Sequence, residues 1–372
     1  MTGRRRLGFD LPLAGAALLL VTVGVLFVFS SSSFMARDKL NQSFHFMNQQ
    51  LLGVLAGFLL AIFLVSVKRS FFIQPMFVYG LLALTIFLLT LCFVMPTVAR
   101  TNRCVILAGV RFQPSELAKI SLVLFLATFI EGRRDRLHEP RTLALPLAVL
   151  VVTVVLVLLE PDFGTAVLLF ALAGILLFIG GVKLRYFAVA GVLFLALFAF
   201  YLAQADYRVE RLQGFLSPQK DVLGRGYQVD QSKLALGAGG LVGVGLGQST
   251  QKLNFLPFAH TDFIYAIIGE ETGLLGTLFT LALYLLVLWR GLKITQAAPS
   301  PALKMVAACL TFGVVVQALM NMSIVLGLGP AKGTPLPLVS YGRSSLVCTL
   351  AAIGLLLHIS QKKGDGGAPV KI

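Results

Sequence analysis

The sequence predicts an all-α integral membrane protein with ten transmembrane helices and one long extracytoplasmic loop between the seventh and the eighth. Hydrophobic residues make up 57% of the 372 residues and charged residues only 13%, about half the charged share of a typical soluble domain. The mean hydropathy is +0.89. The apolar residues are gathered into runs of roughly 20, which is the length that a helix needs to cross a bilayer.

The ten apolar runs define the expected elements in order. We place the spans at residues 11–31, 46–67, 75–95, 115–131, 143–159, 164–182, 185–204, 262–289, 303–327 and 342–361. The first run follows three arginines and is longer than a signal-peptide core, so we predict that it is retained as a span. No interior stretch resembles a soluble domain, and we treat residues 1–372 as one polytopic domain.

The basic residues predict the orientation of the chain in the membrane. With the N-terminus inside, 17 of the 31 lysines and arginines fall in inner segments, eight beside short outer loops and six in the long outer loop. Cytoplasmic loops are enriched in basic residues, so this bias predicts that both termini are cytoplasmic. The same bias explains the net charge of +15 as contact with anionic lipid, because no basic patch on a soluble module suggests nucleic acid.

Residues 205–261 form the predicted outer loop, which is too long for an ordinary connection. We expect short amphipathic helices on the membrane surface joined by glycine turns. The glycines at 237–247 resemble half of a nucleotide-binding fingerprint, but no strand precedes them and no G-K-[ST] follows. The four cysteines and four histidines show no metal-ligand spacing, which argues against a zinc site or a disulfide.

Asp262 is the candidate catalytic residue, because it stands where the long loop enters the eighth span. An ionisable residue at the mouth of a membrane helix is a functional-site hypothesis by default. The alternative is a helix-capping role, which Thr261 could fill instead. Glu270 and Glu271 follow in the same span, about 80° and 180° around the helix from Asp262. We therefore expect only Glu270 to flank the same cavity, and Glu271 to pair elsewhere.

Further charged residues stand at the outer ends of other spans. Glu116 and Lys119 are three residues apart near a helix start, so an ion pair is expected, with a pure packing role as the alternative. Glu160 and Asp162 flank Pro161, which we expect to open the sixth span, with Asp162 favoured by the helix dipole or acting as a cap. The loop at 329–343 contains Lys332 and Arg343 and could bind an anionic head group.

Five stretches resemble the successive signatures of the SEDS family of peptidoglycan glycosyltransferases, and most closely its cell-division branch. They are QPSELAK (113–119), EPDFGTA (160–166), GGLVGVGLGQSTQK (239–252), LPFAHTDFIYAIIGEETG (256–273) and PAKGTPLPLVSYGRSSL (330–346). The resemblance implies ten spans in the bacterial inner membrane and polymerisation of lipid II on the outer face, at the septum for a division member. It also implies a class B penicillin-binding protein transpeptidase and other divisome membrane proteins as partners. The family's essential aspartate corresponds to Asp262.

The implied reaction joins a sugar 4-hydroxyl to an anomeric carbon and releases undecaprenyl pyrophosphate with inversion. A hydroxyl is a poor nucleophile, so we assign Asp262 as the general base. The leaving group needs positive charge, from a divalent cation (Mg²⁺ or Mn²⁺) or from basic side chains. The substrate-binding candidates are Lys332, Arg343, Arg103, Arg111, Lys252, His260 and Ser340. Glu116 and Lys119 are expected to shape the cavity.

Several positions depart from the pattern of the division branch, including Asn254 or Phe258, where an acidic residue is usual. Arg343 stands where a second glycine is usual, and Cys104 follows Arg103 where tryptophan is common. These changes put the arrangement of the surrounding loops in doubt and leave the chemistry in place. The alternatives to a septal polymerase are an elongation polymerase, a lipid II flippase and a non-catalytic divisome scaffold. Intramembrane charges suit a flippase, but no internal repeat is evident.

Overall fold

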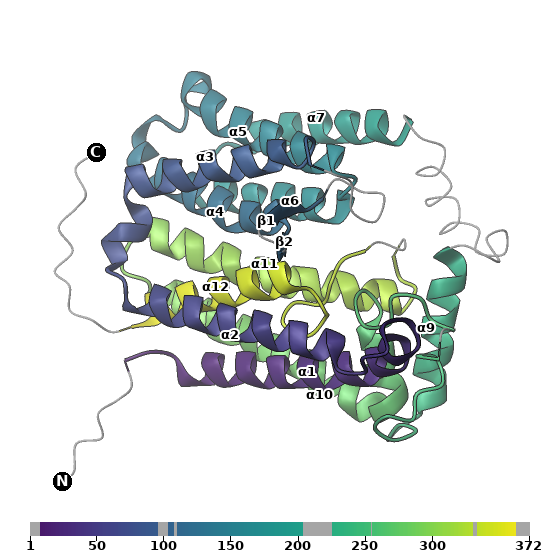
Figure 1. Ribbon diagram of the computed structural model, residues 1–372. Coiled ribbons are helices and arrows are strands. Elements are labelled where there is room, and N and C mark those ends of the chain that lie inside the picture. Colours follow the sequence, from purple (N-terminus) through teal and green to yellow (C-terminus); the bar gives the residue numbers. More distant parts are fainter. Residues whose placement is uncertain are drawn as a thin grey trace, which may run out of the picture.

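The computed structural model describes residues 8–95, 103–107, 110–203, 225–253, 255–329 and 333–361. Long helices lie side by side in this part of the chain, and a two-stranded antiparallel hairpin accompanies them (Figure 1). The helices are α1 (Leu11–Leu40), α2 (His45–Ser66), α3 (Pro75–Leu91), α4 (Pro114–Gly132), α5 (Pro140–Leu159), α6 (Phe163–Ile179), α7 (Leu184–Ala203), α9 (Arg225–Gly239), α10 (Ile264–Ala297), α11 (Pro301–Val325) and α12 (Arg343–Ser360). The short elements are η1 (Arg69–Ile73), β1 (Val105–Leu107), β2 (Val110–Phe112) and η2 (Arg134–Arg136).

Six of the described helices are long and apolar enough to cross a membrane: α1, α2, α5, α10, α11 and α12. Shorter apolar helices form at α3, α6 and within α7. Every predicted span coincides with a helix, which confirms an all-α membrane protein, while the count of ten crossings stays a prediction. The hairpin of β1 and β2 was not predicted, and α1 continues to Leu40 beyond the expected end at residue 31.

Local sequence explains where several helices begin. Proline occupies an early position in α3, α4, α5 and α11, where its missing N–H costs no helical hydrogen bond. Asp10, Asp162 and Ser300 each accept a hydrogen bond from the backbone N–H three residues later, at 3.0, 3.2 and 3.3 Å. These caps satisfy backbone donors that would otherwise be left bare at the start of α1, α6 and α11.

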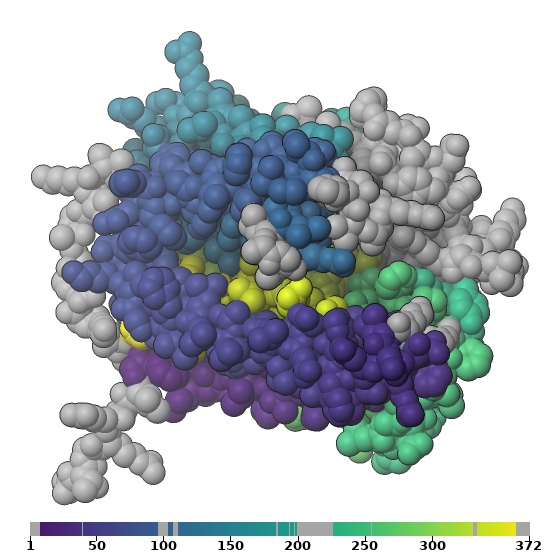
Figure 2. Space-filling view, in the orientation of Figure 1, coloured from purple at the N-terminus to yellow at the C-terminus, as the bar shows by residue number. Residues whose placement is uncertain are grey.

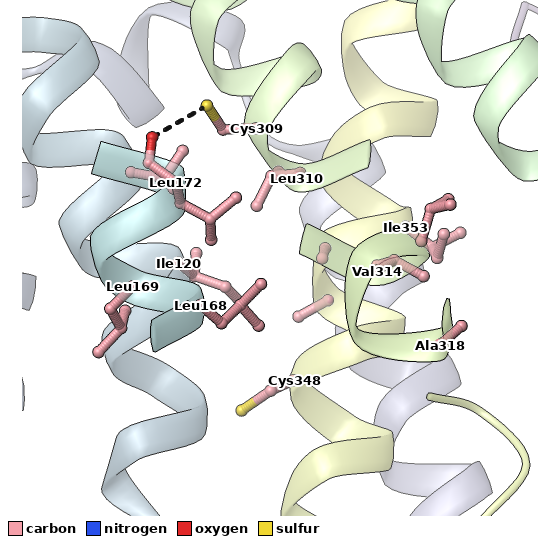
Figure 3. Packing of buried hydrophobic residues seen from close by; sticks show 14 of the residues in the cluster. Ile120, Leu168, Leu169, Leu172, Cys309, Leu310, Val314, Ala318, Cys348 and Ile353 are labelled. Atoms are coloured by element: carbon pink, nitrogen blue, oxygen red, sulfur yellow. Dashed lines mark hydrogen bonds between the residues drawn. The ribbon is translucent and has the colours of Figure 1, made fainter. Parts of the chain in front are cut away.

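Small residues allow α2 and α12 to pack closely. A Cβ atom on Gly57 would lie 2.5 Å from Leu350 Cδ1, and one on Gly354 would lie 2.8 Å from the Cα of Ala61. Helix association in lipid depends on such close approach. Lipid tails are as apolar as the helix side chains, so helices gain little hydrophobic free energy when they pack together. A second part of the core lies between α4, α6, α11 and α12, to which Ile120, Leu172, Cys309 and Cys348 contribute (Figure 3).

The two ends of the helix bundle carry different groups. At one end, Asp10 N donates to Ser360 Oγ at 3.0 Å and Arg290 Nε donates to Asp10 Oδ1 at 3.0 Å, so the start of α1 meets the ends of α12 and α10. At the opposite end lie Asp262 and the loop before α12. This arrangement is what an even number of crossings requires, and the side of the membrane on which each end lies stays a prediction.

The long loop was predicted at residues 205–261, and residues 204–224 lie outside the described part. Residues 225–239 form α9, which lies across the ends of the long helices (Figure 1). Four turns follow at Gly240, Gly243, Gly245 and Gly247, all with positive φ. The expected glycine turns are therefore present, because only glycine adopts these angles without steric cost.

The predicted single span at 262–289 is wrong in one respect, because α10 is broken at Gly273, where φ is 67°. Residues 240–245 fit into the break: Leu274 N donates to Gly240 O at 2.9 Å and Val244 N donates to Glu270 O at 3.0 Å. The loop thus satisfies backbone groups that the broken helix leaves unpaired, which is the condition for irregular backbone near lipid. Green segments gather at the right and lower right of the molecule, on the side where α9 lies in Figure 1 (Figure 2).

Candidate functional site

Asp262 lies in a turn, residues 260–263, that directly precedes α10; we call it the Asp262 turn. The N-cap of α10 is Phe263, without a side-chain capping hydrogen bond, and Thr261 Oγ1 donates to Phe258 O at 3.1 Å. The N-cap position considered for Asp262 or Thr261 is therefore occupied by Phe263 instead. The Asp262 side chain is half-buried and lies against Gly333, where a Cβ atom would be 3.1 Å from Asp262 Oδ2.

Ser340 was a substrate-binding candidate, and the structure gives it a different task. Its hydroxyl donates to Thr261 O at 2.5 Å and accepts from Leu336 N at 2.8 Å. The residue is buried, with 4% of its surface exposed. Ser340 therefore holds the Asp262 turn against residues 333–341, which we call the 333–341 loop, rather than presenting its hydroxyl to a substrate.

His260 belongs to an aromatic cluster beside Asp262. Its ring centroid lies 4.9 Å from that of Phe46 and 5.7 Å from that of Tyr341. Burial lowers the pKa of His260 to about 4, because the charged imidazolium loses its hydration. His260 is therefore neutral at pH 7, so it can offer a hydrogen bond but no positive charge to a phosphate.

Arg111 and Arg343 are brought to the same edge of the site. Ser344 Oγ accepts from Gln113 N at 3.1 Å and donates to Arg111 O at 3.3 Å, which joins β2 to the start of α12. Burial raises the pKa of Tyr341, and the positive charges of Arg343 and Arg111 oppose that rise, so both guanidinium groups lie near its ring. Two cations beside a helix N-terminus form an environment that favours anions.

The other basic candidates are placed differently. Arg103 donates to the carbonyl oxygens of Glu160 (2.9 Å) and Pro161, so it holds the turn between α5 and α6. Lys252 is 3.0 Å from Glu271 and also donates to Gly247 O at 2.6 Å, which makes it part of a buried ion pair rather than a phosphate ligand. Lys332 lies outside the described residues.

Asp162 caps α6 and also connects helices. Its Oδ2 accepts from Thr165 Oγ1 at 2.9 Å and from Gln113 Nε2 at 3.0 Å. The expectation that Pro161 opens the helix is wrong, since α6 begins at Phe163 after the Asp162 cap. Burial, reinforced by the charge of Asp162, raises the pKa of the neighbouring Glu160 to about 8.

Glu116 and Lys119 form the expected ion pair, with 2.7 Å between Lys119 Nζ and Glu116 Oε2. Lys119 Nζ also donates to Gln317 Oε1 at 2.7 Å, and Gln317 Nε2 donates to Pro335 O at 3.1 Å. The pair lines a partly open cavity of about 30 Å³, enough for about two water molecules. These charges therefore support the 333–341 loop from inside the bundle.

Glu270 and Glu271 anchor the glycine-rich loop. Glu270 Oε1 accepts from the backbone N–H and the hydroxyl of Thr250, both at 2.9 Å. Glu271 accepts from Gly247 N at 2.9 Å and from Ser30 Oγ at 2.6 Å, in addition to its pair with Lys252. Both carboxylates are buried. Glu270 was expected to flank the cavity beside Asp262, and the structure instead directs its carboxylate to residues 249–251.

Sequence reasoning missed Asn321 and Gln317 of α11. Asn321 Nδ2 donates to Asp262 O and to Thr334 O, each at 2.7 Å. Both residues are amides four positions apart in an otherwise apolar span, so they lie on one helix face. Polar side chains inside a span are uncommon and usually find a partner across helices, and this signal could have singled them out.

Within the part of the chain that the structure describes, no group of three or more His, Cys, Asp or Glu side chains could hold a metal ion. Arg111 and Arg343 lie near Tyr341, whose N–H donates to His260 O in the Asp262 turn at 2.9 Å. The site thus combines one half-buried carboxylate with two guanidinium groups at one end of a membrane bundle.

The fold and this site define a multi-pass membrane protein with a carboxylate at the end of a broken helix. The FtsW/RodA/SpoVE family, described as "Cell cycle protein", matches residues 11–364. The chain belongs to this family, and it is a multi-pass protein of the bacterial inner membrane.

Curated relatives and solved structures agree with this assignment. The chain is 36% identical over 359 residues to a probable peptidoglycan glycosyltransferase FtsW of Geobacter sulfurreducens, covering 95% of each. It is 35% identical over 356 residues to stage V sporulation protein E of Bacillus subtilis, covering 95% of this chain and 97% of that protein. A chain of a solved peptidoglycan synthase complex aligns with a TM-score of 0.78 at 30% identity, covering 95% and 98%. Thermus thermophilus RodA aligns with a TM-score of 0.70 at 27% identity, covering 96% and 98%.

Proposed function

We propose that this chain is a peptidoglycan glycosyltransferase of septal cell-wall synthesis, with Asp262 as its general base. The activity class is that of the FtsW relatives, which are 35–38% identical over nearly the full length. The single observation that carries the residue assignment is the position of the Asp262 carboxylate. It is half-buried in a tightly held turn, and Arg111 and Arg343 lie at the same end of the bundle.

The reaction class follows from these groups. The substrate is lipid II, and the 4-hydroxyl of its N-acetylglucosamine attacks the anomeric carbon of a second chain's N-acetylmuramic acid. Asp262 accepts the hydroxyl proton as the new bond forms, a role worth about 10² to 10⁴ in rate. The pyrophosphate leaves from the opposite face with inversion, and its negative charge lies against Arg111 and Arg343.

The proposed enzyme also has a divalent cation, a defined orientation in the membrane and protein partners. A divalent ion, Mg²⁺ or Mn²⁺, would enter with the pyrophosphate and offset part of its negative charge. We propose ten spans with both termini in the cytoplasm and Asp262 at the outer face, and the basic residues of the inner loops support this orientation. A class B penicillin-binding protein is the proposed partner, together with other divisome membrane proteins, because the solved relative belongs to a synthase complex that couples polymerization with crosslinking.

A division role is favoured over an elongation role by the relatives. Those named FtsW reach 38% identity over 360 residues, against 27% for Thermus thermophilus RodA. Septal or side-wall localisation of a fluorescent fusion separates the two roles directly.

The test is glycan synthesis from labelled lipid II by the purified protein with its penicillin-binding partner. We expect Asp262→Asn to lower the rate by about 10²-fold or more, because an amide cannot accept the proton. The matched control is Asp230→Asn, an exposed carboxylate on α9. Equal amounts of glycan from the wild type and from Asp262→Asn would contradict the assignment of Asp262 as the general base. Lipid II crossing liposomes without any glycan product indicates a flippase instead.

A further inference from the structure

We infer that Asn321 is a positioning residue that fixes the Asp262 carboxylate by joining two irregular segments. Asn321 lies on α11 and is 1% exposed, so it cannot touch a substrate. Its Nδ2 donates to Asp262 O and to Thr334 O, both at 2.7 Å. A side-chain amide nitrogen carries two protons, so one group serves both carbonyls.

Neither segment has a regular hydrogen-bond ladder to hold it. The Asp262 turn precedes α10, and the 333–341 loop precedes α12. Three successive carbonyls of the turn accept hydrogen bonds from outside: His260 from Tyr341 N at 2.9 Å, Thr261 from Ser340 Oγ at 2.5 Å, and Asp262 from Asn321. The first two donors belong to the 333–341 loop itself. Asn321 is the donor that belongs to a helix and therefore ties both segments to the bundle.

The second hydrogen bond of Asn321, to Thr334 O, holds the backbone that lies beside the Asp262 carboxylate. Thr334 follows Gly333, whose backbone lies so close to Asp262 Oδ2 that a Cβ atom there would be 3.1 Å away. Fixing Thr334 O fixes this backbone, and fixing Asp262 O fixes the residue that faces it. One amide thus helps to set the distance between the Asp262 carboxylate and the backbone of Gly333. A displacement of about 1 Å in such a group can lower a rate about 10²-fold.

Gln317 lies on α11, one helical turn before Asn321. It donates to Pro335 O at 3.1 Å and is held by Lys119. Gln317 therefore supports the 333–341 loop alone, while Asn321 also holds the Asp262 turn. Loss of Asn321 is expected to loosen the turn more than any change that affects the loop alone.

The inference rests on the proposed function, and the experiment separates the two. Asn321→Ala removes both donors, Asn321→Ser keeps one, and Ser323→Ala is the control on α11, where the hydroxyl contacts only its own helix at Leu319 O. The full-length protein with its penicillin-binding partner is assayed for kcat and KM with lipid II. Hydrogen exchange is measured on the peptide covering residues 258–266.

For Asn321→Ala we expect kcat to fall about 10- to 100-fold, with KM changed less than about twofold. Exchange of the 258–266 peptide rises about tenfold, Asn321→Ser is intermediate, and Ser323→Ala matches the wild type. A kcat within about twofold of wild type, or unchanged exchange in both Asn321 variants, overturns the inference. If the wild type makes no glycan, the proposed function fails, and the exchange measurement still decides whether Asn321 holds the turn.

Discussion

Lys252 Nζ lies 3.0 Å from Glu271 Oε1, and this ion pair locks the glycine-rich loop onto the broken helix α10. Both side chains are sealed from solvent, at 9% and 0% exposed. Ser30 of α1 donates to the same Glu271 oxygen at 2.6 Å, so three segments distant in the sequence meet at one carboxylate. The pair therefore has a structural role near the start of α10.

Breaking this pair should destabilise the protein strongly. Removing one partner leaves the other charge buried without compensation, a change that costs about 3–5 kcal/mol. We expect Glu271→Gln and Lys252→Met to lower the thermal unfolding temperature in detergent. The double variant should recover part of the loss, since no lone charge remains. Additive effects of the two substitutions would show that the two groups do not interact.

Gly273 is expected to tolerate no side chain. Its φ is 67°, and a Cβ atom there would lie 2.5 Å from both Gly243 N and Leu241 O. Gly273→Ala should therefore cost about 2 kcal/mol or more, from backbone strain and from displacement of the loop. The control is Gly237→Ala in α9, where nothing lies within 4 Å and alanine should stabilise the helix by about 1 kcal/mol. Similar unfolding temperatures for both variants would refute the role of the break.

Arg111 and Arg343 should contribute to binding of the pyrophosphate group. Substitution of either by glutamine removes a charge-assisted hydrogen bond worth about 1.5–3 kcal/mol, so KM for lipid II should rise about tenfold or more. The effect should shrink at high salt, because exposed charges are screened. Arg136→Gln, exposed in η2, is the control, and steady-state assays over a salt series provide the measurement. Equal KM values for all three variants would exclude the two arginines from the binding site.

Glu160 should make stability depend on pH. The folded chain holds its proton up to about pH 8, whereas the unfolded chain releases it near pH 4.5. The contribution of Glu160 to the folding stability is therefore present in full below pH 4.5 and is lost as the pH rises toward 8. We expect the unfolding temperature to fall by about 2–5 °C across this window in the wild type, and by less in Glu160→Gln. Parallel curves for the two proteins would contradict this assignment.

The sequence anticipated the helical elements and the family well. Apolar runs of bilayer length predicted every long helix, because a chain in lipid must satisfy its backbone hydrogen bonds within each span. The motifs around Asp262 predicted the family that the comparisons confirmed. The pairing of Glu116 with Lys119 also followed from spacing alone, since residues three apart meet on a helix.

The basic candidates were harder to assign, because a positive charge looks the same in sequence whether it binds phosphate or a buried carboxylate. Lys252 and Arg103 stand in family motifs or beside them, yet one pairs with Glu271 and the other holds the turn at Glu160. Arg111 and Arg343 lie more than 200 positions apart, and only the hydrogen bonds of Ser344 bring them to one edge. Such partners are set by folding rather than by local pattern.

The amino-acid sequence by itself determined the membrane class and the helix positions, since hydropathy and helix periodicity act locally, and its motifs made Asp262 the candidate. Only the tertiary structure decided how Asp262 is held, because its supports come from α11 and from the loop before α12. The same holds for the break at Gly273, whose unpaired backbone groups are satisfied by residues 240–245. Hydrogen bonds between irregular segments have no period in the sequence, and they form only when the helices have fixed both segments in place.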